Sequence, residues 1–295
     1  IVIFINGLPL SYIEVKQPNA IRDGKTAIQS EQSRTAVRFE NRRFRRFNNI
    51  TQLISFSDNL PYISGQGQQK QGSFYCSNAF SKTKFNAFKE EREEELIYSI
   101  RSLGEEEIDA VLKDVNRFAL KSQPEFKTNQ DPSTPCNTFI SSLYQKERLL
   151  FLLRYGLAYV EEHSKDGTIQ LQKHVMRYPQ FFATKAIEDA IGKGVKKGVI
   201  WHTQGSGKTA LSYFNIRYLT NYFSKQEIVP QFYFVVDRLD LADQATREFT
   251  KRGLKVKRIN RPQELNEKHD AYQVAVVNIQ KFKDNSDLTD HSGYD

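Results

Sequence analysis

Two short motifs in this sequence carry side chains whose types and spacing could do chemistry. The first is Glu14-Val15-Lys16, in which an acid and a lysine stand two residues apart. On a β-strand such residues project from the same face. A metal-dependent nuclease needs this arrangement, because the carboxylate holds Mg²⁺ while the lysine orients the nucleophile or neutralises charge on the phosphate. The pattern is short, and a surface ion pair on an edge strand is the ordinary alternative.

The second motif is His202-Thr-Gln-Gly-Ser-Gly-Lys-Thr209, which predicts a nucleotide-binding P-loop. An apolar stretch at 198–201 precedes it, and a helix is expected to follow. Glycines let backbone N–H groups approach phosphate oxygens, the lysine meets the outer phosphates, and the last hydroxyl coordinates Mg²⁺. His202 departs from the strict pattern, which has glycine there. The predicted ATP contacts in the loop are Thr203, Gln204, Gly205, Ser206, Gly207, Lys208 and Thr209.

Arginines alternate with phenylalanines between residues 34 and 46, where Glu40 is the one acid. Arginines bind phosphate, and aromatic rings between them can stack on bases. A helix that turns its phenylalanines to the core and its arginines to water explains the same pattern equally well. The candidate DNA-binding residues of this run are Arg42, Arg43, Arg45 and Arg46.

A hairpin is expected to position the acid and the lysine. Residues 1–5 and 8–15 read as strands joined by Asn6-Gly7, a strong signal for a two-residue turn. Regular pairing sets Ile1 against Tyr12, so a residue before Ile1 would fall opposite Ile13 and on the other face from Glu14. A bulge, which Pro9 favours, would bring that residue to the face of Glu14.

The order of predicted helices and strands differs between the two halves of the chain. A basic helical stretch at 24–47, strands at 51–57 and 72–77, and helices at 86–103, 105–120 and 138–160 are predicted first, and the acidic run at 89–95 reads as a solvated helix face. Helices at 180–191, 209–223 and 241–251 then alternate with strands at 198–201, 231–236 and 273–278. This alternation predicts a parallel sheet with crossover helices.

Composition excludes several classes of protein. The 295 residues include 43 basic and 35 acidic side chains, for a net charge of +8. The 39% apolar content supplies a real core and argues against disorder, collagen or a coiled coil. The longest apolar stretch, 149–160, contains Arg154 and is shorter than the roughly 18–20 residues of a membrane helix. Cys76 and Cys136 form no CxxC motif, so we expect a reduced, cytoplasmic setting without membrane contact.

Taken together, the hairpin, the P-loop WHTQGSGKT, VVDRLDLADQ and NIQKF resemble the restriction (R) subunit of type I restriction–modification enzymes. The resemblance implies an α/β fold: a PD-(D/E)xK-type nuclease domain with a mixed sheet and flanking helices at 1–135, a helical connector at 136–172, and a RecA-like parallel α/β domain of a superfamily 2 helicase motor at 173–295. It also implies a first catalytic Asp before Ile1 and a DEAH-type motif after residue 295. Each domain is therefore expected to be truncated, and the 295 residues alone to be inactive.

The same resemblance assigns roles to individual residues. It makes Glu14 and Lys16 catalytic, with Glu14 a metal ligand and Gln32, or else Gln29, completing the nuclease site. Gln180 would read adenine, Thr209 would coordinate Mg²⁺, and Asp237 and Arg238 would touch DNA. The implied cofactors are ATP and Mg²⁺, and the implied partners are double-stranded DNA and the methyltransferase (M) and specificity (S) subunits.

Two other classes of function stay open on the sequence. One is a superfamily 2 DNA helicase or a repair or remodelling ATPase whose N-terminal domain binds DNA without cutting it. The other is a non-enzymatic assembly module that docks other subunits through its helical middle. The motor without a nuclease gives no reason for Glu14 and Lys16 to meet a further acid.

Overall fold

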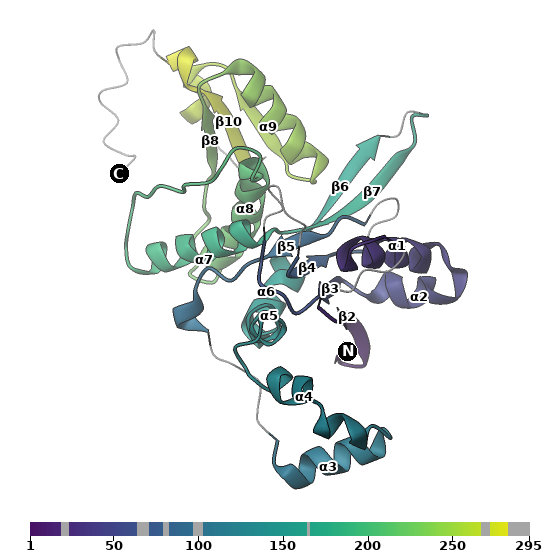
Figure 1. Ribbon diagram of the computed structural model, residues 1–295. Coiled ribbons are helices and arrows are strands. Elements are labelled where there is room, and N and C mark those ends of the chain that lie inside the picture. Colours follow the sequence, from purple (N-terminus) through teal and green to yellow (C-terminus); the bar gives the residue numbers. More distant parts are fainter. Residues whose placement is uncertain are drawn as a thin grey trace. The chain divides into compact units, whose positions relative to one another are not determined.

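The computed structural model describes residues 1–18, 24–63, 71–78, 83–96, 103–163, 166–266 and 272–282 (Figure 1). The chain forms two compact units, Ile1–Leu157 and Ala158–Asp295, and the predicted connector at 136–172 is divided between them. The end of the helix predicted at 86–103, from residue 97 to residue 102, lies outside the described residues. So does the chain end after residue 282.

A five-stranded mixed sheet in the order β1-β2-β3-β4-β5 forms the centre of the first unit. Strands β2 and β3 are parallel, and the other neighbours are antiparallel. Strand β3 is buried along its whole length because it is central and covered on both faces. The strands are β1 (Val2–Ile5), β2 (Leu8–Val15), β3 (Leu53–Ser57), β4 (Ser73–Cys76) and β5 (Asn86–Phe88).

The hairpin of β1 and β2 contains the bulge that Pro9 favours. The turn residues Asn6 and Gly7 have φ of 50° and 77°, as a type I′ turn requires. Pairing is regular at the turn and then shifts between Ile3 and Phe4, which leaves Leu10 as the extra residue. Val2 therefore pairs with Tyr12, so the predicted bulge is confirmed and the regular register is wrong by one residue.

Helices cover both faces of this sheet. Helices α1 (Ala27–Glu40) and α2 (Arg42–Ile50) connect β2 to β3 and cover one face. Their Phe39 and Phe47 pack on a core made of Tyr12, Ile28, Ile54, Phe56, Phe74, Cys76 and Phe85. On the other face, Phe139 of α5 (Pro135–Leu143) lies 5.2 Å from Phe88, ring centroid to ring centroid.

The helix predicted at 86–103 is wrong over its described part. Residues 86–88 form β5, because Ala87 pairs with Phe74 of β4 and Phe88 is buried. A short 3₁₀ turn, η1 (Glu93–Glu95), follows. The solvated-face interpretation of residues 89–95 also fails at Glu90, whose 3% exposed side chain pairs with Arg148 at 2.6 Å.

The single helix predicted at 138–160 is also wrong. Helix α5 ends at Leu143, and the hydroxyl of the next residue, Tyr144, bonds Ser11 and Ser55 inside the unit, at 2.8 and 2.6 Å. Helix α6 (Lys146–Tyr155) then ends at Gly156, and strand β6 (Leu157–His163) begins.

The helix predicted at 105–120 is shorter than expected. Its first part is α3 (Glu105–Asp114), and a 3₁₀ turn, η2 (Phe118–Ser122), follows before α4 (Pro124–Asn129).

The second unit contains the predicted alternation of helices and strands. Its parallel sheet has the order β8-β10-β9, and Phe249 of α9 packs on it with its ring 5.2 Å from that of Phe234. A separate hairpin pairs β6 with β7 (Ile169–Val175). The other elements are α7 (Tyr178–Gly192), α8 (Lys208–Ser224), β8 (Tyr233–Val236), α9 (Leu239–Lys251), β9 (Val256–Ile259), η3 (Pro262–Asn266), β10 (Val274–Asn278) and η4 (Ile279–Phe282).

The strand predicted at 198–201 is the exception in this unit. These residues are irregular, with Val199 89% and Trp201 92% exposed. A strand is held by hydrogen bonds to a neighbour, and within the described chain β8, β9 and β10 pair only with one another. In the ranges that the structure describes, no helix is both long and apolar enough to cross a membrane.

Candidate functional site

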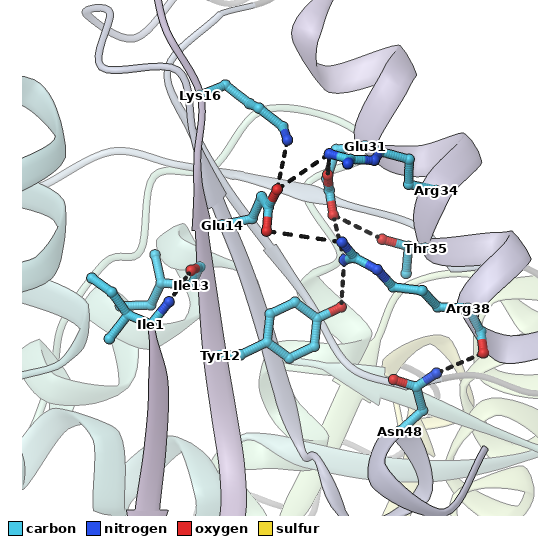
Figure 2. Close-up of polar contacts among 10 residues, drawn as sticks. All are labelled: Ile1, Tyr12, Ile13, Glu14, Lys16, Glu31, Arg34, Thr35, Arg38 and Asn48. Carbon is cyan, nitrogen blue, oxygen red and sulfur yellow. Dashed lines mark hydrogen bonds and ion pairs between the residues drawn. The ribbon is translucent and has the colours of Figure 1, made fainter. Parts of the chain in front are cut away.

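Glu14 and Lys16 lie on the face of β2 that α1 covers, and they contact each other (Figure 2). The Lys16 ammonium donates to Glu14 Oε1 at 2.5 Å. Both side chains are partly exposed, 23% for Lys16 and 29% for Glu14, so a solvent-borne substrate can reach them. Strand alternation is the cause, since Tyr12, Glu14 and Lys16 share one face.

Two arginines of α1 also hold the Glu14 carboxylate. Arg34 Nη1 is 3.2 Å from Glu14 Oε1, and Arg38 Nη2 is 3.9 Å from Oε2. Burial works to raise the pKa of Glu14, but the Lys16 hydrogen bond and the charges of Lys16, Arg38 and Arg34 outweigh it and lower the pKa. Glu14 is therefore an anion at neutral pH, as a metal ligand must be.

Glu31 is the residue at this place that sequence reasoning missed. Its buried side chain contacts Arg38 Nη1 at 3.0 Å, and Thr35 donates to it at 3.4 Å. A signal was present, because residues 31, 35 and 38 follow helical spacing and form one face of α1. Gln32 is the next residue along and is exposed, while the Gln29 side chain caps α1 by accepting from the Thr26 N–H at 3.0 Å. The structure thus brings neither glutamine to the Glu14–Lys16 pair.

The start of β1 lies beside the end of β2. Ile1 and Ile13 exchange both backbone hydrogen bonds, with N···O distances of 2.8 and 3.0 Å. A residue preceding Ile1 in a longer chain would fall opposite Glu14 and on its face. This is the consequence of the bulge at Leu10.

The donor set at this face suits a hard cation. Carboxylate oxygens are the ligands that Mg²⁺ prefers, and one or two carboxylates plus substrate phosphate are enough to bind it. Glu14 supplies one carboxylate, and Glu31 Oε2 is a buried oxygen without a hydrogen-bond partner. Within the described ranges, no group of three His, Cys, Asp or Glu side chains gathers around one point. Mg²⁺ therefore fits this face when a phosphate or a further acid completes its ligands.

The predicted phosphate loop lies at the start of α8. Gly205 and Gly207 have φ of 76° and 85°, the left-handed conformation that the two glycines permit. Lys208 opens the helix, and its ammonium donates to the carbonyls of His202 and Thr203 at 2.9 and 3.0 Å. The lysine therefore has to leave these carbonyls in order to reach a phosphate. The remaining predicted contacts lie in the loop and the first helical turn: Thr203, Gln204, Ser206 and Thr209.

Gln180 joins the N-terminus of α7 to this loop. Its side chain accepts from the Arg177 N–H at 2.9 Å and donates to the Gly207 carbonyl at 2.9 Å. Arg177 also donates to the Gly205 carbonyl at 3.2 Å. A Cβ on Gly207 would lie 2.6 Å from Gln180 Nε2, so glycine is required for this contact. In this conformation the Gln180 amide contacts the loop, and reading adenine would require it to exchange these partners.

The arginine-rich run forms an exposed basic surface on α2, made of Arg42, Arg43, Arg45 and Arg46. Phe47 packs on Tyr12 with a ring separation of 6.0 Å, while Phe44 is 49% exposed. Asn41 begins the helix by accepting from the Arg43 N–H at 2.9 Å. Within the described part of the chain, none of these four arginines has an ion-pair partner.

Asp237 and Arg238 follow the end of β8 and are both exposed. Arg238 forms a two-pronged ion pair with Asp240, at 3.0 and 2.5 Å. This pairing lowers the pKa of Asp240. Arg238 would have to exchange this partner for a DNA phosphate.

Comparisons with known proteins place this chain beside restriction enzymes. The SWI2/SNF2 ATPase family matches residues 179–293. The putative type I restriction enzyme MjaVIIP endonuclease subunit of Methanocaldococcus jannaschii is 44% identical over 34% of the chain and 10% of its own length. The putative MjaIXP endonuclease subunit of the same organism is 23% identical over 96% of the chain and 24% of its own length. The type I restriction enzyme SauCOLORF180P endonuclease subunit of Staphylococcus aureus is 35% identical over 36% of the chain.

The matches cover part of this chain and a smaller part of each relative. The chain spans about a quarter of the length of the MjaIXP subunit and about a tenth of the MjaVIIP and SauCOLORF180P subunits. The ATPase match covers the second unit from the start of α7, including the predicted P-loop. The similarities thus establish an ATPase-like region at residues 179–293 and a likeness to proteins named as restriction endonuclease subunits.

Proposed function

We propose that this chain carries the nuclease site and part of the ATP-driven motor of a DNA-cleaving subunit. The premise is that the chain is similar to the endonuclease subunits of type I restriction enzymes. The first unit is then a PD-(D/E)xK-type nuclease domain, and the second is a RecA-like domain of a superfamily 2 motor. The proposed domain limits are those predicted from the sequence, at 1–135, 136–172 and 173–295, with the helical connector divided between the two units. The partners are double-stranded DNA and methyltransferase and specificity subunits in the cytoplasm.

The observation that carries the nuclease part is the Glu14–Lys16 pair on one face of β2. Both side chains are partly exposed, and α1 adds Arg34 and Arg38 beside them. Lys16 can neutralise charge that develops on the scissile phosphate, and Glu14 is held in its charged form. Mg²⁺, when bound there, would supply an activated water and charge for the phosphate oxygens. Gln32, exposed on α1, stays a proposed residue of the nuclease site.

The motor part rests on the loop between residues 202 and 209. Its backbone N–H groups, the Lys208 ammonium and the start of α8 form the usual binding site for nucleotide phosphates. Thr209, in the first turn of α8, is suited to hold the Mg²⁺ that accompanies ATP. Gln180, which already contacts the loop, would sense the base.

The basic surface on α2 supports contact with the DNA backbone. Arg42 and Arg43 stand in the first turn of α2, where the helix dipole disfavours positive charge. A phosphate nearby would remove this cost and pair with the guanidinium groups. The solvated-face alternative explains exposure of the arginines but not their position at this end of the helix. Asp237 and Arg238 are proposed as a further backbone contact.

A second candidate function is a motor without a nuclease. The similarity to SWI2/SNF2 ATPases over residues 179–293 favours it, since it concerns the motor region alone. In that case the first unit binds DNA without cutting it.

One experiment separates the two candidates. The complete subunit, assembled with its methyltransferase and specificity subunits, is incubated with unmethylated circular DNA carrying a recognition site. The nuclease proposal predicts double-strand cuts that require both ATP and Mg²⁺. ATP hydrolysis with intact circles would contradict it and favour the motor alone.

A further inference from the structure

Glu31 has an unusual environment for a carboxylate in the first unit. Its side chain is 1% exposed. Oε1 accepts from Arg38 at 3.0 Å, but Oε2 is buried without a hydrogen-bond partner, and the Arg34 Nη1 atom is 3.8 Å from it. An unsatisfied buried oxygen is costly and is a common sign of an ion or a function.

Glu31 and Glu14 approach each other through the arginines that they share (Figure 2). Arg34 Nη1 is 3.2 Å from Glu14 and 3.8 Å from Glu31, and Arg38 likewise contacts both acids. Each guanidinium thus stands between two carboxylates that lie close to each other. The two acids therefore repel each other, and positive charge between them relieves that repulsion.

We propose that Glu31 is a second carboxylate ligand, together with Glu14, for the divalent cation of this face. This inference rests on the proposed nuclease function and adds to it a ligand on the helix opposite the strand. The cation binds Glu31 Oε2, the oxygen that lacks a partner, and a carboxylate oxygen of Glu14. Substrate phosphate and water complete the ligands, as is usual for Mg²⁺.

The two arginines have different parts in this arrangement. Arg34 is 49% exposed and occupies the space between the acids, so it can leave at little cost and pair with a DNA phosphate. Arg38 is 29% exposed and is tied down by the Tyr12 hydroxyl, to which it donates at 3.5 Å. Arg38 therefore stays and fixes Glu31 Oε1, which leaves Oε2 free to bind the cation.

The competing explanation is that Glu31 only holds α1 on the sheet through Arg38. It accounts for the Oε1 contact and leaves Oε2 unexplained. Under that explanation, removing the Glu31 charge lowers stability without altering cation affinity in the folded protein. Removing the Arg34 charge would tighten cation binding under either explanation, because Arg34 also contacts Glu14.

The test measures Mn²⁺ binding by titration calorimetry on the 295-residue chain without nucleotide. Glu14→Gln and Glu31→Gln should each weaken Mn²⁺ binding about 10-fold or more. Glu40→Gln is the matched control, because Glu40 is an exposed acid at the far end of α1, and it should bind as the unchanged chain does. Arg34→Met should bind Mn²⁺ more tightly, since a competing positive charge is removed.

The outcomes distinguish this inference from the function on which it rests. Weakened binding in Glu14→Gln with unchanged binding in folded Glu31→Gln overturns the role of Glu31 and leaves the nuclease proposal standing. Unchanged binding in both variants overturns both. If Glu31→Gln fails to fold, Arg34→Met combined with Glu14→Gln decides, because Arg34 then competes only for Glu31. Mn²⁺ binding tighter than in Glu14→Gln alone supports Glu31 as a ligand, and unchanged or weaker binding contradicts it.

Discussion

Ile1 and Ile13 form a hydrogen-bonded pair across the first hairpin, with both N–H groups donating to the partner carbonyl. Antiparallel pairs alternate between hydrogen-bonded and non-hydrogen-bonded, so the next pair joins Glu14 to whatever residue precedes Ile1. Its two side chains share a face and stand close together. This is where the proposed nuclease needs its first acid.

A disulfide tests this pairing. In a chain extended by one cysteine ahead of Ile1, Glu14→Cys should form a cross-link on mild oxidation, because Cβ atoms of a non-hydrogen-bonded pair lie at disulfide distance. Ile13→Cys in the same extended chain is the matched control and should stay reduced, since its side chain points to the other face. The cross-link is detected by mass spectrometry of peptides. Cross-linking in Ile13→Cys and not in Glu14→Cys would show that the bulge is absent in solution.

Lys208→Ala in the complete subunit should reduce ATP hydrolysis on the order of 10²-fold or more, because one charge that stabilises the outer phosphates is lost. DNA translocation and cleavage should fall with it. Lys193→Ala, at the exposed end of α7, removes a similar charge and should leave the rate unchanged. Normal hydrolysis by Lys208→Ala would refute the P-loop assignment.

Replacing the four arginines of α2 by alanine should weaken DNA binding equally for all sequences. The slope of log affinity against log salt should decrease by about 3–4, close to one per lost phosphate contact. Fluorescence anisotropy at several salt concentrations measures both quantities. A control with the same change of charge replaces exposed residues elsewhere in the first unit: Lys113, Arg117, Lys127 and Lys146. An identical slope in the two proteins would favour a merely solvated helix face.

Tyr12 should make the chain sensitive to alkali. Burial raises the pKa of its phenol from 10.0 to about 12, against a smaller lowering by Arg38. The unfolded chain therefore loses this proton at a lower pH than the folded chain does. The contribution of Tyr12 to the free energy of unfolding is thus complete below pH 10 and is lost as the pH rises towards 12. Tyr12→Phe should reduce the fall in unfolding free energy between pH 9 and pH 11 by about 1 kcal/mol. Urea titrations measure it, with exposed Tyr159→Phe as the control; equal falls in all three proteins would contradict the prediction.

Much of this fold could be predicted because local signals agreed with the tertiary structure. Asn6-Gly7 defined the hairpin, Pro9 indicated its bulge, and alternation of strands and helices predicted the parallel sheet of the second unit. The helix expected at 86–103 failed because pairing with β4 overrides the local preference of residues 86–88. The strand expected at 198–201 failed because strands depend on neighbours, which a local pattern does not contain.

Part of the candidate site could be predicted from the sequence, and part of it could not. Glu14, Lys16 and the P-loop follow from residue type and spacing alone. Glu31 does not, because its importance comes from burial and from arginines that also hold Glu14. The partners of Gln180 were likewise hidden, since the loop that it contacts lies more than twenty residues further along the chain.

The central claim is that Glu14 and Lys16 cut DNA while a separate site hydrolyses ATP. The most direct test measures the rates of DNA cleavage and ATP hydrolysis in the assembled complex. The complete subunit in that complex carries either Glu14→Ala or Lys16→Ala. We expect cleavage of unmethylated circular DNA to disappear in each variant while ATP hydrolysis continues at the rate of the unchanged complex. Full cleavage by either variant would contradict the claim and leave the pair as an ordinary surface ion pair.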